Sequence, residues 1–214
     1  MKVLVVGANG KIGRQLVKLL AEEKHHQVRA MVRKEEQMEK MKQLGAEPVL
    51  ADLSGRVQDI AEAARGCDAV VFTAGSGGHT GADQTILIDL DGAVKTVEAT
   101  KLAGIDRFVM VSAIGANKRE KWSDKIKHYH AAKYYADEAL KASGLNYTIV
   151  RPGALLDSEG SGKISAAEEL DRGSIPRADV AQVLAVVLDE PNTYRRSFDL
   201  VSGDTAITDA LKYL

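Results

Sequence analysis

The sequence predicts an α/β protein built as a single doubly wound domain over residues 1–214, with helices on both faces of a mostly parallel seven-stranded sheet. Three observations predict this fold class. Short apolar runs alternate with helical patterns almost to the end of the chain. The runs lack internal polar–apolar alternation, which is typical of parallel strands buried on both faces. A glycine-rich turn follows the first run and opens the first helix, as in dinucleotide-binding folds.

The expected elements alternate along the whole chain, as a doubly wound sheet requires. Runs of β-forming residues predict seven strands, over 3–6, 28–32, 48–51, 69–73, 108–111, 147–150 and 198–201. The segments between them predict six helices, over 11–23, 35–44, 56–65, 82–103, 123–142 and 180–188. Residues 157–176 are rich in Ser, Gly and Glu, and we expect a loop there. This loop lies in a small substrate-side segment at about residues 154–178.

Composition and charge exclude several classes of protein. The chain is 45% hydrophobic and 28% charged, with a net charge of −1, so nothing indicates a nucleic-acid partner. No run approaches the roughly 20 apolar residues of a membrane span. The first apolar run stops at Val6, too early for a secretory signal. We therefore expect a cytoplasmic protein without nucleic-acid or membrane partners, and its oligomeric state stays open.

Residue spacing also argues against a metal centre. Cys67 is the only cysteine, and one cysteine cannot form an internal disulfide or a Cys-based zinc site. His128 and His130 are two residues apart on an expected helix, so they point to different sides. We expect no bound metal.

The glycine-rich turn indicates a phosphate-binding site. Residues 7–13 read Gly-Ala-Asn-Gly-Lys-Ile-Gly between the first strand and the first helix. Backbone without Cβ atoms lets a pyrophosphate approach, and amides at the helix N-terminus bind its charge. A Walker A loop is excluded, because the lysine is wrongly spaced and no Ser or Thr follows it. The cofactor-binding candidates here are Gly7, Asn9, Gly10, Lys11, Ile12 and Gly13.

The end of the second strand favours NADP over NAD. NAD sites place an Asp or Glu about 20 residues after the glycines, to hold the ribose 2′-hydroxyl. This chain has Arg33 and Lys34 instead. The planar guanidinium of Arg33 suits a 2′-phosphate, and Arg14 could reach the same region from the first helix.

With these features the sequence resembles the short-chain dehydrogenase/reductase superfamily of Rossmann folds. The similarity is to its small atypical members, which include NmrA-like, flavin-reductase-like and NAD-dependent epimerase/dehydratase-like proteins. It covers nearly the whole chain. The marks are the motifs at residues 7–13, Ala51-Asp52-Leu53, Thr73-Ala74-Gly75, Val111-Ser112-Ala113, Tyr129-His130-Ala131-Ala132-Lys133, Arg151-Pro152-Gly153 and Arg177-Ala178-Asp179-Val180-Ala181.

The resemblance implies contacts along the cofactor. Asp52 and the Leu53 amide would face the adenine, and Ala74 and Gly75 would pass under the adenine-ribose side. Pro152 and Gly153 would approach the nicotinamide. Each pair follows an expected strand, where a doubly wound sheet binds its ligands.

A Tyr–Lys pair supplies the candidate catalytic groups. Tyr129 and Lys133 are four residues apart on an expected helix and share a face. The ammonium should lower the pKa of the tyrosine, which could then exchange a proton with a substrate oxygen. Ser112, at the end of the fifth strand, would hold that oxygen. The resemblance adds that Lys133 contacts the nicotinamide ribose and that Ser112 lies beside the cofactor, so we expect all three to converge there.

Two features leave this chemistry open. Tyr-x-x-x-Lys is also common on helices where it has no catalytic role. Where the superfamily often has Asn in the helix after strand four, this chain has Asp89. Many atypical members keep the fold without the usual catalytic set.

Three functions therefore remain in view. The first is an NADP-dependent oxidoreductase acting on a small carbonyl or ring substrate. The second is an NAD(P)-dependent epimerase or dehydratase, although the chain after Gly153 leaves little room for a sugar-nucleotide domain. The third is a redox sensor that binds NADP without turnover.

Overall fold

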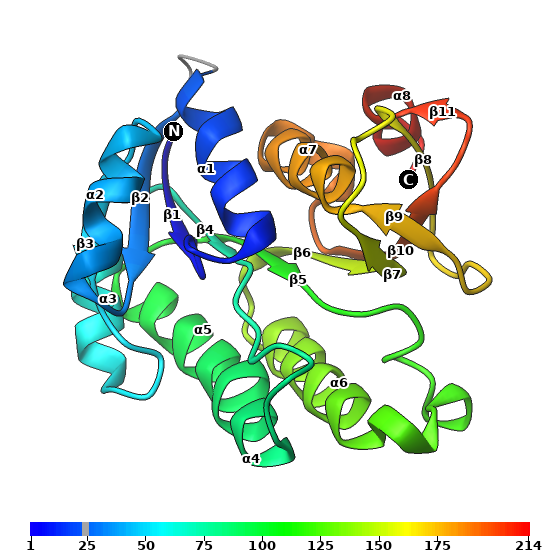
Figure 1. Cartoon of the computed structure of the whole chain (residues 1–214), viewed down its shortest axis with the longest axis horizontal. Helices are drawn as coiled ribbons and strands as arrows, with labels where there is room; N and C mark the ends of the chain where they lie inside the picture. The colour runs from blue at the N-terminus through cyan, green and yellow to red at the C-terminus, as the bar shows by residue number, and fades with distance from the viewer. Residues whose placement is uncertain (23–25) are drawn as a thin grey trace.

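The computed structural model describes residues 1–22 and 26–214 and contains one large twisted sheet covered by helices (Figure 1). The strand order is β11-β8-β10-β6-β5-β4-β1-β2-β3. All seven expected strands are present and mutually parallel: β1 (Lys2–Val6), β2 (Gln27–Val32), β3 (Glu47–Leu50), β4 (Ala69–Phe72), β5 (Arg107–Val111), β6 (Asn146–Pro152) and β10 (Arg196–Ser202). The α/β fold class predicted from the apolar runs is confirmed.

The expected number of strands was wrong, because the sheet has nine. Strand β8 (Lys163–Ala167) pairs antiparallel with β10, and β11 (Thr205–Ala206) pairs antiparallel with β8. Two further short strands, β7 (Ala154–Leu156) and β9 (Ser174–Pro176), form a separate two-stranded sheet. Residues 157–176 therefore carry strand structure rather than forming a loop throughout. Strand β11 forms this edge of the sheet, and β8 lies between β11 and β10.

The helices lie on both faces of the sheet. They are α1 (Lys11–Glu22), α2 (Met38–Gln43), α3 (Val57–Ala64), α4 (Ala82–Gln84), α5 (Gly92–Leu102), α6 (Lys127–Ala142), α7 (Arg177–Asp189) and α8 (Ile207–Lys212). The long helix expected over 82–103 is interrupted by a π-helical segment at Thr85–Asp91. The helix expected from 123 is preceded by a 3-10 turn at Asp124–Ile126. Residue 23, the expected end of the first helix, lies outside the described residues.

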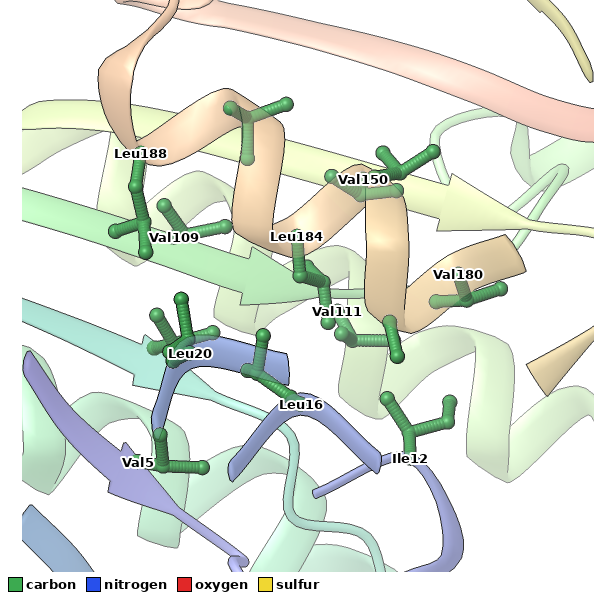
Figure 2. Close-up of a cluster of buried hydrophobic side chains, with 14 of the residues drawn as sticks. Val5, Ile12, Leu16, Leu20, Val109, Val111, Val150, Val180, Leu184 and Leu188 are labelled. Atoms are coloured by element: carbon green, nitrogen blue, oxygen red, sulfur yellow. The ribbon is translucent and has the colours of Figure 1, made fainter. Parts of the chain in front are cut away.

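Each sheet face has its own apolar core. Successive β1 side chains alternate between the two cores, Val3 and Val5 on one side and Leu4 and Val6 on the other. Figure 2 shows the first core, where Leu16 and Leu20 of α1 meet Leu184 and Leu188 of α7 above the sheet. Helices α3, α5 and α6 cover the opposite core. No helix among the described residues is long and apolar enough to cross a membrane.

Candidate functional site

The parallel strands bring the predicted cofactor residues to one edge of the sheet. The glycine turn follows β1, Arg33 follows β2, and Asp52 and Leu53 follow β3. Along the same edge come Ala74 and Gly75 after β4, Ser112 after β5, and Pro152 and Gly153 at the end of β6. Ligands of doubly wound sheets bind outside this carboxyl edge.

The glycine turn has no room for side chains at two of its three glycines. Gly7 has a φ of +80°, and a Cβ there would lie 2.6 Å from the Ala74 backbone nitrogen. A Cβ on Gly13 would lie 2.3 Å from the Gly7 carbonyl oxygen. Gly10 differs, because it is exposed and a Cβ would meet only the Gly7 oxygen, at 3.2 Å. The turn is therefore tightly packed at Gly7 and Gly13 and open to solvent at Gly10, which leaves space for a pyrophosphate at Gly10.

Other residues of the turn differ in burial: some pack in the core and others are exposed to solvent. Ile12 packs in the core of the α1 face, so only its backbone is free for a cofactor. Asn9 and Arg14 are half-buried. Lys11 is exposed, and its Nζ lies 2.6 Å from Asp157 Oδ2.

The second and third strand ends present polar groups to the same edge. Arg33 is exposed, and among the described residues no carboxylate pairs with its guanidinium. Lys34, by contrast, pairs with Glu36 at 3.4 Å. Asp52 is exposed and accepts a hydrogen bond from the Ser54 amide at 2.8 Å. Arg33 is thus available to an external anion.

A buried ion pair joins the π-helical segment Thr85–Asp91 to helix α6. Lys133 is 3% exposed and Asp89 is 1% exposed. Lys133 Nζ lies 3.2 Å from Asp89 Oδ1, and it donates to the Val111 carbonyl oxygen at 3.3 Å. Burial lowers the pKa of Lys133, but Tyr129 and Asp89 outweigh it and the net pKa is raised. The lysine is therefore held charged and in one orientation.

Tyr129 lies next to this lysine on the same face of α6. The centre of its ring is 5.7 Å from Lys133 Nζ, and the residue is half-buried. Burial raises the pKa of Tyr129, and the charge of Lys133 offsets only part of that effect. The expected net lowering of this pKa is therefore not seen in the chain alone, chiefly because the tyrosine is buried, and Asp89 and Asp137 raise the pKa further.

Ser112 is brought to the same strand edge but is turned away from solvent. It is 2% exposed, and its Oγ is enclosed without a hydrogen-bond partner. Its amide donates to the Val150 carbonyl oxygen at 2.7 Å, which fixes the backbone. The hydroxyl can reach a substrate only if the side chain turns.

Sequence reasoning missed a buried charged group next to Ser112. Asp137 on α6 is 1% exposed, and neither of its carboxyl oxygens has a hydrogen-bond partner. Arg151 Nε lies 3.7 Å from Asp137 Oδ2, and Arg151 Nη1 lies 3.3 Å from Asp199 Oδ1. Asp199 Oδ2 accepts the Leu170 amide at 3.1 Å. Charged residues inside the apolar strands β6 and β10 were the signal that could have revealed this group.

Two sets of ion pairs connect the substrate-side segment, residues 154–178, to neighbouring parts of the chain. Asp157 is held by Lys11 from the glycine turn and by Arg177 of α7, whose Nη1 lies 2.7 Å from Asp157 Oδ1. Glu169 pairs with Lys118 and Lys121, which come from the segment after β5. A cavity of about 220 Å³ lies there, lined by Ile114, Gly115, Asn117, Lys118, Lys121, Glu169, Leu170, Asp171, Arg172 and Asp199.

Comparison with known proteins agrees with this geometry. A family model described as NAD(P)H-binding matches residues 7–191. A Bacillus subtilis protein named "Uncharacterized sugar epimerase YhfK" is 56% identical over 214 residues, covering all of both chains. A Bacillus halodurans structure described as an NAD-dependent epimerase/dehydratase is 45% identical, covers all of both chains and has a TM-score of 0.94. A Lactococcus lactis structure described as an oxidoreductase is 32% identical over 100% of this chain and 96% of its own, with a TM-score of 0.91.

Proposed function

We propose that this chain, which belongs to the NAD(P)H-binding family, is an NADP-dependent oxidoreductase of the short-chain dehydrogenase/reductase type. Its substrate would be a small carbonyl compound or a reducible ring. The observation that carries this proposal is the Tyr129–Lys133 pair on one face of α6, with the lysine fixed by Asp89. This pair lies at the sheet edge that also bears the glycine turn.

The cofactor assignment rests on the chemistry of the donor set. The open position above Gly10 suits the pyrophosphate, and the amides that begin α1 would bind its charge. Arg33 has an unengaged guanidinium at the end of β2 and would bind a 2′-phosphate, with Arg14 as a second cation. Asp52, Leu53, Ala74, Gly75, Pro152 and Gly153 would line the rest of the cofactor.

The catalytic roles follow from what each side chain can donate. A nicotinamide, when bound, supplies or accepts a hydride. Tyr129 would donate its phenolic proton to the substrate oxygen as the general acid. Lys133 would stabilise the phenolate that remains and hold the cofactor ribose. Ser112 would donate a hydrogen bond to the same substrate oxygen.

The epimerase or dehydratase reading is favoured by the names of the B. subtilis and B. halodurans relatives. The substrate-side segment of residues 154–178 is short, which argues for a smaller substrate than a nucleotide sugar. We therefore rank the oxidoreductase first.

Consumption of NADPH with a panel of quinones, flavins and small carbonyls tests the proposal. Tyr129→Phe should abolish turnover while leaving NADPH binding intact. Tyr135→Phe is the matched control, because Tyr135 is an exposed tyrosine on the same helix. Tight NADPH binding without turnover would favour the sensor, and isomerisation of a sugar without net NADPH loss would favour the epimerase.

A further inference from the structure

The strongest unexplained feature of the molecule is a pair of buried polar side chains without hydrogen bonds. Within residues 1–22 and 26–214, Ser112 Oγ and both carboxyl oxygens of Asp137 are enclosed and have no hydrogen-bond partner. Buried polar groups are hydrogen-bonded in the great majority of cases, and exceptions often mark function. Asp137 lies one turn after Lys133 on α6. The unpartnered polar groups are therefore next to the candidate catalytic residues.

The two side chains are near each other although their geometry falls short of a formed hydrogen bond. The Ser112 hydroxyl acts on Asp137 as a donor that lowers the pKa of the carboxyl, and burial acts more strongly in the opposite direction. The net pKa of Asp137 is raised to about 6. A small turn of the serine side chain would complete the contact.

Arg151 does not account for Asp137 as a simple ion-pair partner. Its Nε is 3.7 Å from Asp137 Oδ2, which is beyond hydrogen-bond distance. Its Nη1 is directed to Asp199 instead, at 3.3 Å. An ionised carboxylate with neither oxygen hydrogen-bonded is costly to bury, whereas a neutral carboxyl is much less so.

We propose that Asp137 is a positioning residue whose protonation state sets the direction of the Ser112 hydroxyl. A serine hydroxyl has one hydrogen and can donate it to only one acceptor. When Asp137 is ionised, Ser112 donates inward to the carboxylate and cannot serve a substrate oxygen. When Asp137 is neutral, the carboxyl donates to Ser112 Oγ, and the serine hydrogen is free to point at the substrate. This inference rests on the proposed role of Ser112 in catalysis.

Other charged groups surround Asp137 and set the pH at which it titrates. They are Arg151 on β6, Lys133, Lys141 and Tyr129 on α6, and, behind Lys133 and Arg151, Asp89 and Asp199. The nearest cations favour the ionised form and burial favours the neutral form. The group is thus poised between the two states rather than fixed in one.

Steady-state kinetics with saturating NADPH test the proposal between pH 5.5 and 8.5. For the wild type, kcat should fall by up to about tenfold per pH unit above the midpoint of the Asp137 titration, with little change in KM for NADPH. Asp137→Asn cannot ionise and should lose this decline. Glu138→Gln, an exposed neighbour on α6, should keep the wild-type profile. An Asp137→Asn enzyme with the wild-type decline would overturn the proposal.

A second measurement does not depend on turnover. Carbon-13 NMR of the NADP-bound protein should follow the Asp137 carboxyl, and Ser112→Ala should raise its pKa because a donor to the ionised form is lost. An unchanged titration in Ser112→Ala would show that the two residues are uncoupled and would refute the inference. If no substrate of the panel is turned over, the proposed oxidoreductase function fails, while the NMR result still decides the Asp137–Ser112 coupling.

Discussion

Lys133 Nζ lies 3.2 Å from Asp89 Oδ1, and both side chains are almost wholly buried. The pair connects α6 to the π-helical segment Thr85–Asp91, and Asp89 Oδ2 also accepts the Ser76 amide at 2.9 Å. The resemblance to short-chain dehydrogenases would place a neutral Asn where this chain has Asp89. A carboxylate here gives Lys133 a fixed counterion inside the protein, so the lysine charge does not depend on a bound cofactor.

Asp89→Ala should destabilise the fold strongly, because Lys133 would remain as a buried, unpaired charge. Removal of one partner of a buried pair costs about 3–5 kcal/mol. Asp89→Asn should cost less, since its one amide oxygen can still accept from either Ser76 or Lys133, although not from both. The free energy of unfolding in urea measures both effects.

The double variant Asp89→Ala with Lys133→Met supplies the control. It leaves no unpaired charge and should regain part of the lost stability. If Asp89→Ala alone were as stable as the wild type, the pair would not contribute to the fold.

Arg33→Asp should weaken NADPH binding by roughly ten- to a hundredfold and largely spare NADH, because a charge-assisted contact to the 2′-phosphate would be lost. Isothermal calorimetry with both cofactors measures the change. Arg65→Asp makes the same charge change at an exposed arginine near the opposite end of the strands and should have no effect. Equal NADPH affinities for Arg33→Asp and the wild type would show that Arg33 does not bind the 2′-phosphate.

The two glycine positions of the turn should respond differently. Gly13→Ala should lower the free energy of unfolding by about 1–3 kcal/mol, because its Cβ would meet the Gly7 oxygen at 2.3 Å. Gly10→Val should keep the fold and abolish binding of both NADPH and NADH, since its side chain would fill the place of the pyrophosphate. Thermal unfolding and calorimetry separate the two effects. Normal cofactor binding by Gly10→Val would show that the pyrophosphate does not bind at this turn.

Local sequence patterns predicted the central sheet well. The central strands β1, β4 and β5 are buried along nearly their whole length and therefore appear as apolar runs, whereas β3 at the sheet edge is half exposed. Strand β8 was missed because its sequence, Lys-Ile-Ser-Ala-Ala, has one large apolar residue, and β11 because it has two residues. The pairing of β8 with β10 and of β11 with β8 joins residues more than thirty positions apart in the chain, which no local pattern contains.

The candidate site was predictable only where function depends on local spacing. The glycine turn and the Tyr129–Lys133 pair each lie within a few residues, so the sequence indicated both. The Asp137–Arg151–Asp199 group joins α6, β6 and β10 and arises only when the chain folds. Burial of Ser112 likewise depends on packing between elements, so its position at the end of a strand could not reveal it.

The raised pKa of Asp137 makes stability depend on pH, with a definite sign. The carboxyl has a pKa of about 6 in the folded chain, against an ordinary value of 3.8. The folded state therefore holds this proton more tightly than the unfolded state. The resulting stability is fully present below about pH 4 and is lost as the pH rises through about 6. At 1.36 kcal/mol per pKa unit, the loss is roughly 3 kcal/mol.

Asp137→Asn should remove this loss, because the amide does not ionise at any of these pH values. The variant should gain roughly 3 kcal/mol relative to the wild type between pH 4 and pH 7.5, measured as the difference in free energy of unfolding in urea. Asp209→Asn alters an exposed carboxylate on α8 and should show no such gain. Parallel curves for Asp137→Asn and the wild type across this range would mean that Asp137 is ionised in the folded protein throughout, stabilised by Arg151 despite the 3.7 Å separation.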